Sequence, residues 1–98
     1  MSRYTVAPSA VADMDEIWLY VARKANLEAA QRVVDSITRT FPLLAANPGV
    51  GRHRPVLGEG MRTFPVNNYR IYYRQGVRGR VRILHVKHAA RDEKKLFE

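Results

Sequence analysis

The sequence predicts an α+β fold in which a short N-terminal strand is followed by an antiparallel two-helix hairpin packed on a C-terminal three-stranded antiparallel sheet. Two observations predict it: apolar residues recur at helical spacing in the first half, and β-rich runs separated by turn residues fill the second half. At 98 residues, the chain has the length of one small domain, and we expect residues 1–98 to form a single unit.

Residues 3–7 alternate polar and apolar side chains and end at Pro8, which predicts a short strand. We expect Ser9 to cap a helix that runs to about Arg23. One face of this helix carries apolar side chains at the required spacing: Ala10, Met14, Ile17 and Val21. The acidic residues near its beginning are expected to complement the helix dipole rather than to form a catalytic carboxylate pair: Asp13, Asp15 and Glu16.

A second helix is expected to start after Asn26, whose side chain can cap it, and to continue to about residue 47. Its apolar face consists of Ala30, Val33, Val34, Ile37, Phe41 and Leu44. The link at residues 24–26 is so short that the two helices must run antiparallel. Pro42 lies inside the pattern and is expected to kink the helix or to make its last part a separate turn.

Residues 47–60 hold four of the six glycines and two prolines, and this composition predicts a long loop of the kind that often binds a ligand. Strands are expected at 61–66 and 69–75, joined by a tight turn at Asn67 and Asn68, and at about 80–87. With that turn, one face of the hairpin belongs to the core: Arg62, Phe64, Val66, Tyr69, Ile71 and Tyr73. The opposite face carries Arg70, Tyr72 and Arg74.

The third strand has apolar residues at both odd and even positions, which predicts a central strand covered on both faces: Val81, Ile83, Leu84 and Val86. The two helices can cover one face only. We therefore expect the other face to be shielded by the tail at residues 89–98, by a second copy of the chain, or by a segment of another protein.

All of the net charge of +8 comes from the second half of the sequence. Residues 1–49 contain five Lys/Arg and five Asp/Glu, whereas residues 50–98 contain twelve and four. Thirteen of the seventeen basic residues are arginines, which bind carboxylates and phosphates bidentately, and tyrosines alternate with them at positions 69–74. This pattern predicts an anionic partner, either nucleic acid or an acidic protein.

Other site classes receive little support. The sequence has no cysteine, so thiolate metal sites and disulfides are excluded, and we expect no cofactor or metal. His85 and His88 should project to opposite faces of one strand, and His53 lies in a cationic loop, so structural or surface roles are expected for all three. We expect a cytoplasmic protein without a membrane span, because no long apolar run is present.

The chain resembles toxins of the RelE/ParE superfamily of bacterial type II toxin–antitoxin systems over essentially its whole length. The residues that carry the resemblance recur in order from Tyr4 to Asp92: Tyr4, Ala10 and Asp13; Ile17 and Tyr20; Ala30; Phe41, Leu44, Pro48, Gly51 and Arg52; Met61, Arg62, Phe64, Pro65, Val66, Tyr69, Arg70, Ile71, Tyr73 and Arg74; Ile83, Leu84, Val86, His88, Arg91 and Asp92. The chain looks more like the ParE branch. The RelE pattern has strand lysines where this chain has Met61 and Thr63, and a terminal tyrosine where it has Phe97.

The resemblance implies a toxin that inhibits DNA gyrase by binding, without catalytic residues, and forms a hetero-oligomer with an acidic ParD-like antitoxin. We expect the antitoxin to contact Arg62, Arg70, Arg74 or Arg82, and the target to contact Arg52, Arg54 or Arg91. One alternative is a RelE-like ribosome-dependent mRNA endoribonuclease, in which Arg70 and Arg91 would be the catalytic phosphate clamps. Another is a basic nucleic-acid-binding module without toxicity.

Overall fold

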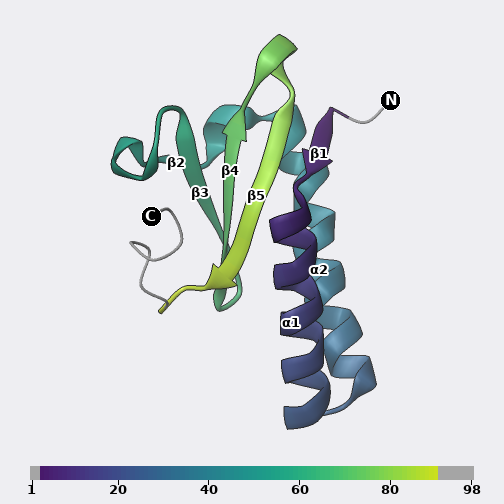
Figure 1. Cartoon of the computed structure of the whole chain (residues 1–98). Coiled ribbons are helices and arrows are strands. Elements are labelled where there is room, and N and C mark those ends of the chain that lie inside the picture. The colour runs from purple at the N-terminus through teal and green to yellow at the C-terminus, as the bar shows by residue number, and fades with distance from the viewer. Residues whose placement is uncertain (1–2, 91–98) are drawn as a thin grey trace.

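Two helices form an antiparallel hairpin beside a five-stranded sheet (Figure 1), in the part of the chain that the computed structural model describes, residues 3–90. The helices are α1 (Pro8–Lys24) and α2 (Leu27–Ala46). The strands are β1 (Tyr4–Val6), β2 (Arg52–His53), β3 (Met61–Val66), β4 (Tyr69–Gln75) and β5 (Val81–His88). The α+β class and the helical hairpin are therefore confirmed.

The sheet is larger than the sequence predicted. Its order is β1-β5-β4-β3-β2, and β1 pairs with β5 in parallel while the other neighbours are antiparallel. The short N-terminal strand thus joins the sheet, and the expected loop at 47–60 contains β2 between the 3₁₀ turns Pro48–Val50 and Pro55–Leu57. Strand β2 has only two residues, which are too few to show the alternation of a strand in the sequence. It is recognised only by its pairing with β3.

The two helix starts differ from each other in how well they were predicted. The Oδ1 atom of Asn26 accepts a hydrogen bond from the backbone N–H of Ala29 at 2.8 Å, so the predicted cap of α2 is confirmed. The prediction for Ser9 was wrong, because Ala7 is the N-cap of α1 and the Ser9 hydroxyl instead donates to the carbonyl of Leu84 at 2.6 Å. Neither helix is long and apolar enough to span a membrane, and residues 3–90 contain no other α-helix.

Pro42 does not divide α2, which continues to Ala46. Pro42 itself is exposed, whereas Phe41 and Leu44, which flank it in the helix, are buried in the core. Burial of these two side chains stabilises the helix across the proline, so the expected separate turn does not form.

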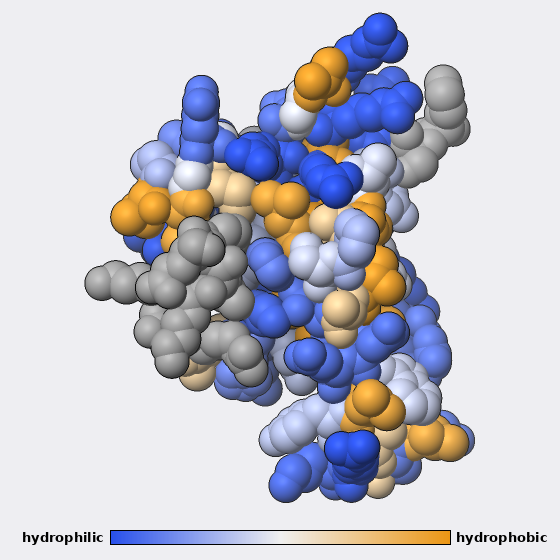
Figure 2. Space-filling model, in the orientation of Figure 1, coloured by the Kyte–Doolittle hydropathy of each residue, from blue (hydrophilic) through white to orange (hydrophobic). Residues whose placement is uncertain are grey.

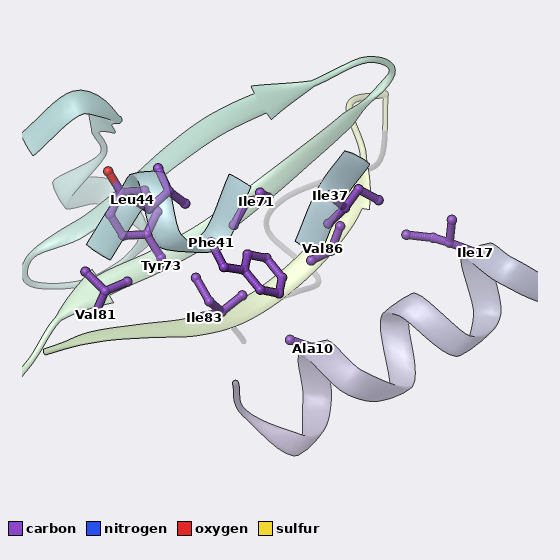
Figure 3. Packing of buried hydrophobic residues seen from close by; sticks show 10 residues of the cluster. All are labelled: Ala10, Ile17, Ile37, Phe41, Leu44, Ile71, Tyr73, Val81, Ile83 and Val86. Atoms are coloured by element: carbon purple, nitrogen blue, oxygen red, sulfur yellow. The ribbon is translucent and has the colours of Figure 1, made fainter. Parts of the chain in front are cut away.

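The hydrophobic core lies between α2, α1 and one face of the sheet (Figure 3). It contains Ala10 and Ile17 of α1, Ile37, Phe41 and Leu44 of α2, Ile71 and Tyr73 of β4, and Val81, Ile83 and Val86 of β5. Phe64 pairs with Ile71 and Val66 pairs with Tyr69, so the predicted core face of the β3–β4 hairpin is confirmed. In the turn between these strands, Asn67 alone of the two asparagines adopts a positive φ, of 55°.

A β-bulge in β5 explains its unusual apolar pattern. Tyr72 pairs with His85 and Tyr73 pairs with Ile83, so Leu84 is an extra residue. The bulge places Val86 on the core face together with Ile83, while Leu84 is half-buried. The pattern at 81–86 therefore reflects an inserted residue rather than burial of alternate residues on both faces, as the sequence had suggested.

Candidate binding face

The sheet face opposite α2 collects most of the basic residues that the sequence singled out, and we call it the basic face. Cross-strand pairing sets its rows: Arg52 pairs with Thr63, which pairs with Tyr72; Pro65 pairs with Arg70, which pairs with Lys87; Met61 pairs with Arg74, which pairs with Arg82. Met61, Thr63 and Tyr72 are buried in the middle of this face. The cations therefore surround a buried centre, on the side of the sheet that the helices leave uncovered.

Three arginines from two segments of the chain line one pocket of about 320 Å³ at the β2 end of this face. Arg52 comes from β2, Arg54 from the residue that precedes the second 3₁₀ turn, and Arg70 from β4. The complete lining is Val50, Arg52, Arg54, Thr63, Phe64, Pro65 and Arg70. The structure thus brings together two arginines expected to contact the target and one expected to contact the antitoxin.

Arg74 and Arg82 form a second basic group, because they lie directly opposite each other on β4 and β5. Both side chains are exposed, and Nη1 of Arg82 lies 3.4 Å from the Thr5 hydroxyl, to which it donates. Like charges on directly paired strand residues repel each other. An anionic partner that binds both guanidinium groups would remove this repulsion.

Arg62 lies on the core side of the sheet, away from the basic face, as its pairing with Tyr73 shows. It is half-buried, and its Nη1 donates to the carbonyl of Gly51 at 2.8 Å. The contact ties β3 to the loop that carries Arg52. One N–H donor of this arginine is therefore committed to an internal hydrogen bond, and its side chain lies on the face opposite the other arginines expected to contact an antitoxin. Arg91 lies outside the described residues.

Tyr73 holds the same loop from β4. Its hydroxyl accepts a hydrogen bond from the Gly51 N–H at 2.8 Å and donates to the carbonyl of Pro48 at 2.7 Å. Burial raises the pKa of this phenol, and the Gly51 hydrogen bond and the nearby charge of Arg62 oppose that rise. A side chain at Gly51 would collide with the Tyr73 hydroxyl and with the Thr63 carbonyl. Glycine is therefore required for the loop to approach the sheet this closely.

Sequence reasoning missed the role of Asp13, which was expected to complement the helix dipole. This residue lies beyond the first turn of α1, and its side chain is 7% exposed. Its Oδ2 atom lies 3.0 Å from Nδ1 of His85 and accepts from the Val86 N–H at 3.0 Å, and its Oδ1 atom lies 2.6 Å from Nζ of Lys87. The carboxylate therefore fastens α1 to β5. Its position in the apolar stripe of α1, between Ala10 and Ile17, was the available signal.

The three histidines do not form a site together. The pairing of His85 with Tyr72 and of His88 with Tyr69 places their side chains on opposite faces of the sheet, as the sequence predicted. His53 is paired with Arg62 on the core side and is exposed. Between residues 3 and 90, no three side chains of the types that bind metals come together.

A larger groove, of about 710 Å³, separates α1 from the ends of β4 and β5. It is lined by Asp13, Glu16, Ile17, Tyr20, Asn68, Tyr69, Val86, Lys87 and His88. The Tyr20 side chain is 59% exposed, and the Tyr69 ring contacts the ring of His88 edge to face. On the side of the molecule shown in Figure 2, hydrophilic residues predominate and hydrophobic residues form separate patches. The groove was not predicted, because its lining comes from three distant segments.

Comparison with known proteins places this geometry in context. Residues 4–93 match the family described as the ParE toxin of the type II toxin–antitoxin system parDE. The chain is 32% identical over 86 residues to toxin ParE1 of Caulobacter vibrioides. The aligned residues make up 87% of this chain and 90% of that protein. It is 26% identical over 91 residues to toxin ParE1 of Mycobacterium tuberculosis, with 93% of each chain covered. A chain from the chromosomal ParDE system of P. aeruginosa superposes with a TM-score of 0.74 at 25% identity, over 90% of this chain and 95% of that one.

Proposed function

This chain belongs to the family of ParE toxins of type II toxin–antitoxin systems, and from that premise we propose that it inhibits DNA gyrase by binding and is neutralised by a cognate ParD-like antitoxin. The basic face is the observation that carries the proposal. It offers a fixed array of guanidinium groups on a rigid sheet, which suits recognition of an acidic surface.

The side chains of the basic face favour binding over RNA cleavage. Cleavage through a 2′-hydroxyl needs one group to accept a proton and another to return it. Arginine stays protonated and does neither. The strand positions where the ribonuclease branch has lysines hold Met61 and Thr63, which are both buried.

The antitoxin is proposed to act by occupying the same face. Arg70 lines one pocket with Arg52 and Arg54, so an acidic segment that binds Arg70, Arg74 and Arg82 would cover part of the surface proposed for the target. Apolar side chains of the same antitoxin would enter the groove beside Tyr20 and Tyr69. Competition for one surface then accounts for neutralisation without any conformational change in the toxin.

A supercoiling assay tests the proposal. The purified, antitoxin-free chain should inhibit gyrase on relaxed plasmid, and charge reversal at Arg52, which is exposed, should weaken inhibition while the fold is retained. Arg39→Glu is the matched control, because Arg39 is exposed on α2, away from the basic face. Codon-specific cleavage of ribosome-bound mRNA with supercoiling unaffected would contradict the proposal and favour the ribonuclease, with Arg70 and Arg91 as the first residues to examine.

A further inference from the structure

We propose that the pocket lined by Arg52, Arg54 and Arg70 binds the phosphodiester backbone of duplex DNA directly. The toxin would then contact the DNA that gyrase holds, in addition to gyrase itself. The choice of DNA over RNA rests on the proposed gyrase target, whereas the phosphate site rests on the geometry of the pocket.

Arginines from two segments of the chain converge on this pocket. Three guanidinium groups come from β2, from the residue after it and from β4, and they line one pocket of about 320 Å³. Each guanidinium presents a planar fork of N–H donors that fits two phosphate oxygens. The buried hydroxyl-bearing side chain of Thr63 also lines the pocket and adds a group that can bind phosphate oxygens.

The part of the chain that forms the pocket is rich in positive charge. Between residues 50 and 90 the sequence has nine Lys/Arg and a single carboxylate, Glu59. Glu59 is exposed in the segment before β3, whereas Lys87, which pairs with Arg70 from β5, is bound by Asp13 of α1. The segment that forms the pocket therefore carries a large excess of positive charge, as expected for a surface that binds a polyanion.

Hydrogen bonds hold the pocket in place, and further cations lie beyond it on the same face. Gly51 is fixed by Tyr73 and Arg62, so the segment that carries Arg52 is held before any ligand arrives. The cations of this face form rows across the sheet: Arg74 and Arg82 lie in one row, about 14 Å along β4 from the row of Arg70. A rigid polyanion such as duplex DNA can contact several of these rows without first becoming ordered, unlike a flexible acidic peptide.

Fluorescence anisotropy with a labelled DNA duplex of arbitrary sequence tests the site in the absence of gyrase. The full chain should bind, and log Kd should rise linearly with log salt concentration. Arg52→Gln and Arg70→Gln should each weaken binding about tenfold and reduce the salt slope by about one. Arg52 is exposed, so its variant should fold normally, which circular dichroism would verify. Arg39→Gln removes the same charge from α2 and should leave binding within about twofold of the parent protein.

Three results would overturn the site. Equal loss of binding in the Arg39→Gln control would show an effect of net charge alone. Tighter binding of an RNA duplex of the same length would reject DNA as the ligand. DNA binding without gyrase inhibition would contradict the proposed function but not the phosphate site. Gyrase inhibition without DNA binding would contradict the phosphate site but not the proposed function.

Discussion

Tyr73 and Gly51 show how single residues position the basic face. The Tyr73 hydroxyl makes two hydrogen bonds to the loop before β2, and it is buried. We predict that Tyr73→Phe lowers the free energy of unfolding by about 1–3 kcal/mol, because the Gly51 N–H and the Pro48 carbonyl lose their partner. Urea unfolding measures the change. Tyr20→Phe is the control, since Tyr20 is exposed and should change stability by less than about 0.5 kcal/mol.

The same hydroxyl makes stability depend on pH. Burial raises the pKa of Tyr73 above its ordinary value of 10.0, so in alkaline solution the unfolded chain loses this proton first. The unfolded state then binds fewer protons than the folded state, and stability falls as pH rises through this range. We predict that the parent protein loses more unfolding free energy between about pH 9 and about pH 11 than Tyr73→Phe does. Equal losses in the two proteins would contradict the prediction. Tyr69, whose pKa burial also raises, contributes to both.

Asp13 is a second residue that joins distant segments, because its carboxylate connects α1 to β5. We predict that Asp13→Ala destabilises the fold by about 3–5 kcal/mol, because it leaves the buried Val86 N–H and the ammonium group of Lys87 without their acceptor. Asp13→Asn retains an acceptor for Val86 and should cost less. Asp15→Ala, at an exposed position of the same helix, is the control and should be nearly silent. Thermal melts of the three variants test this order.

The position of Asp13 in the apolar stripe of α1 indicated burial, but the sequence could not identify its partners, because His85 is 72 residues away. A carboxylate early in a helix is commonly explained by the helix dipole, which is a local effect. In contrast, the shared face of Arg70 and Arg74 followed from alternation along β4, because residues two and four apart on a strand point to the same side. The grouping of Arg52 and Arg54 with Arg70 depended on the unpredicted strand β2.

At the scale of elements, the bulge in β5 separates two neighbouring residues. Ile83 is fully buried in the core, whereas Leu84 is the half-buried extra residue. We predict that Ile83→Asp abolishes folding, because an unpaired carboxylate in the core costs several kcal/mol. Leu84→Asp should remain folded with a lower melting temperature. Circular dichroism distinguishes the two, and equal melting temperatures for both variants would contradict the assignment of the bulge.

The elements with a clear period were predicted well. Both helices and the β3–β4 hairpin follow from spacing, from the cap at Asn26 and from the turn at Asn67. The sequence did not predict the pairing of β1 with β5 or the bulge at Leu84. Pairing between distant segments is decided by packing rather than by local sequence.

At the scale of the whole molecule, the charge is divided between a neutral helical half and a basic half that contains β2 to β5. We predict that the association rate with a co-expressed antitoxin falls steeply as salt concentration rises, while the dissociation rate changes little. Stopped-flow association and surface-based dissociation measurements test this difference. A salt-independent association rate would show that the basic face does not contribute to the encounter.

The contacts between α1 and β5 also affect how the protein behaves at high concentration. β1 pairs with β5 only as far as Ile83, and beyond that residue the Leu84 carbonyl and the Val86 N–H are bound by Ser9 and Asp13 of α1. An open strand edge at this point would offer a template for the strand of another molecule. Because side chains of a helix occupy this part of the edge, we expect α1 to hinder edge-to-edge pairing of the antitoxin-free protein here.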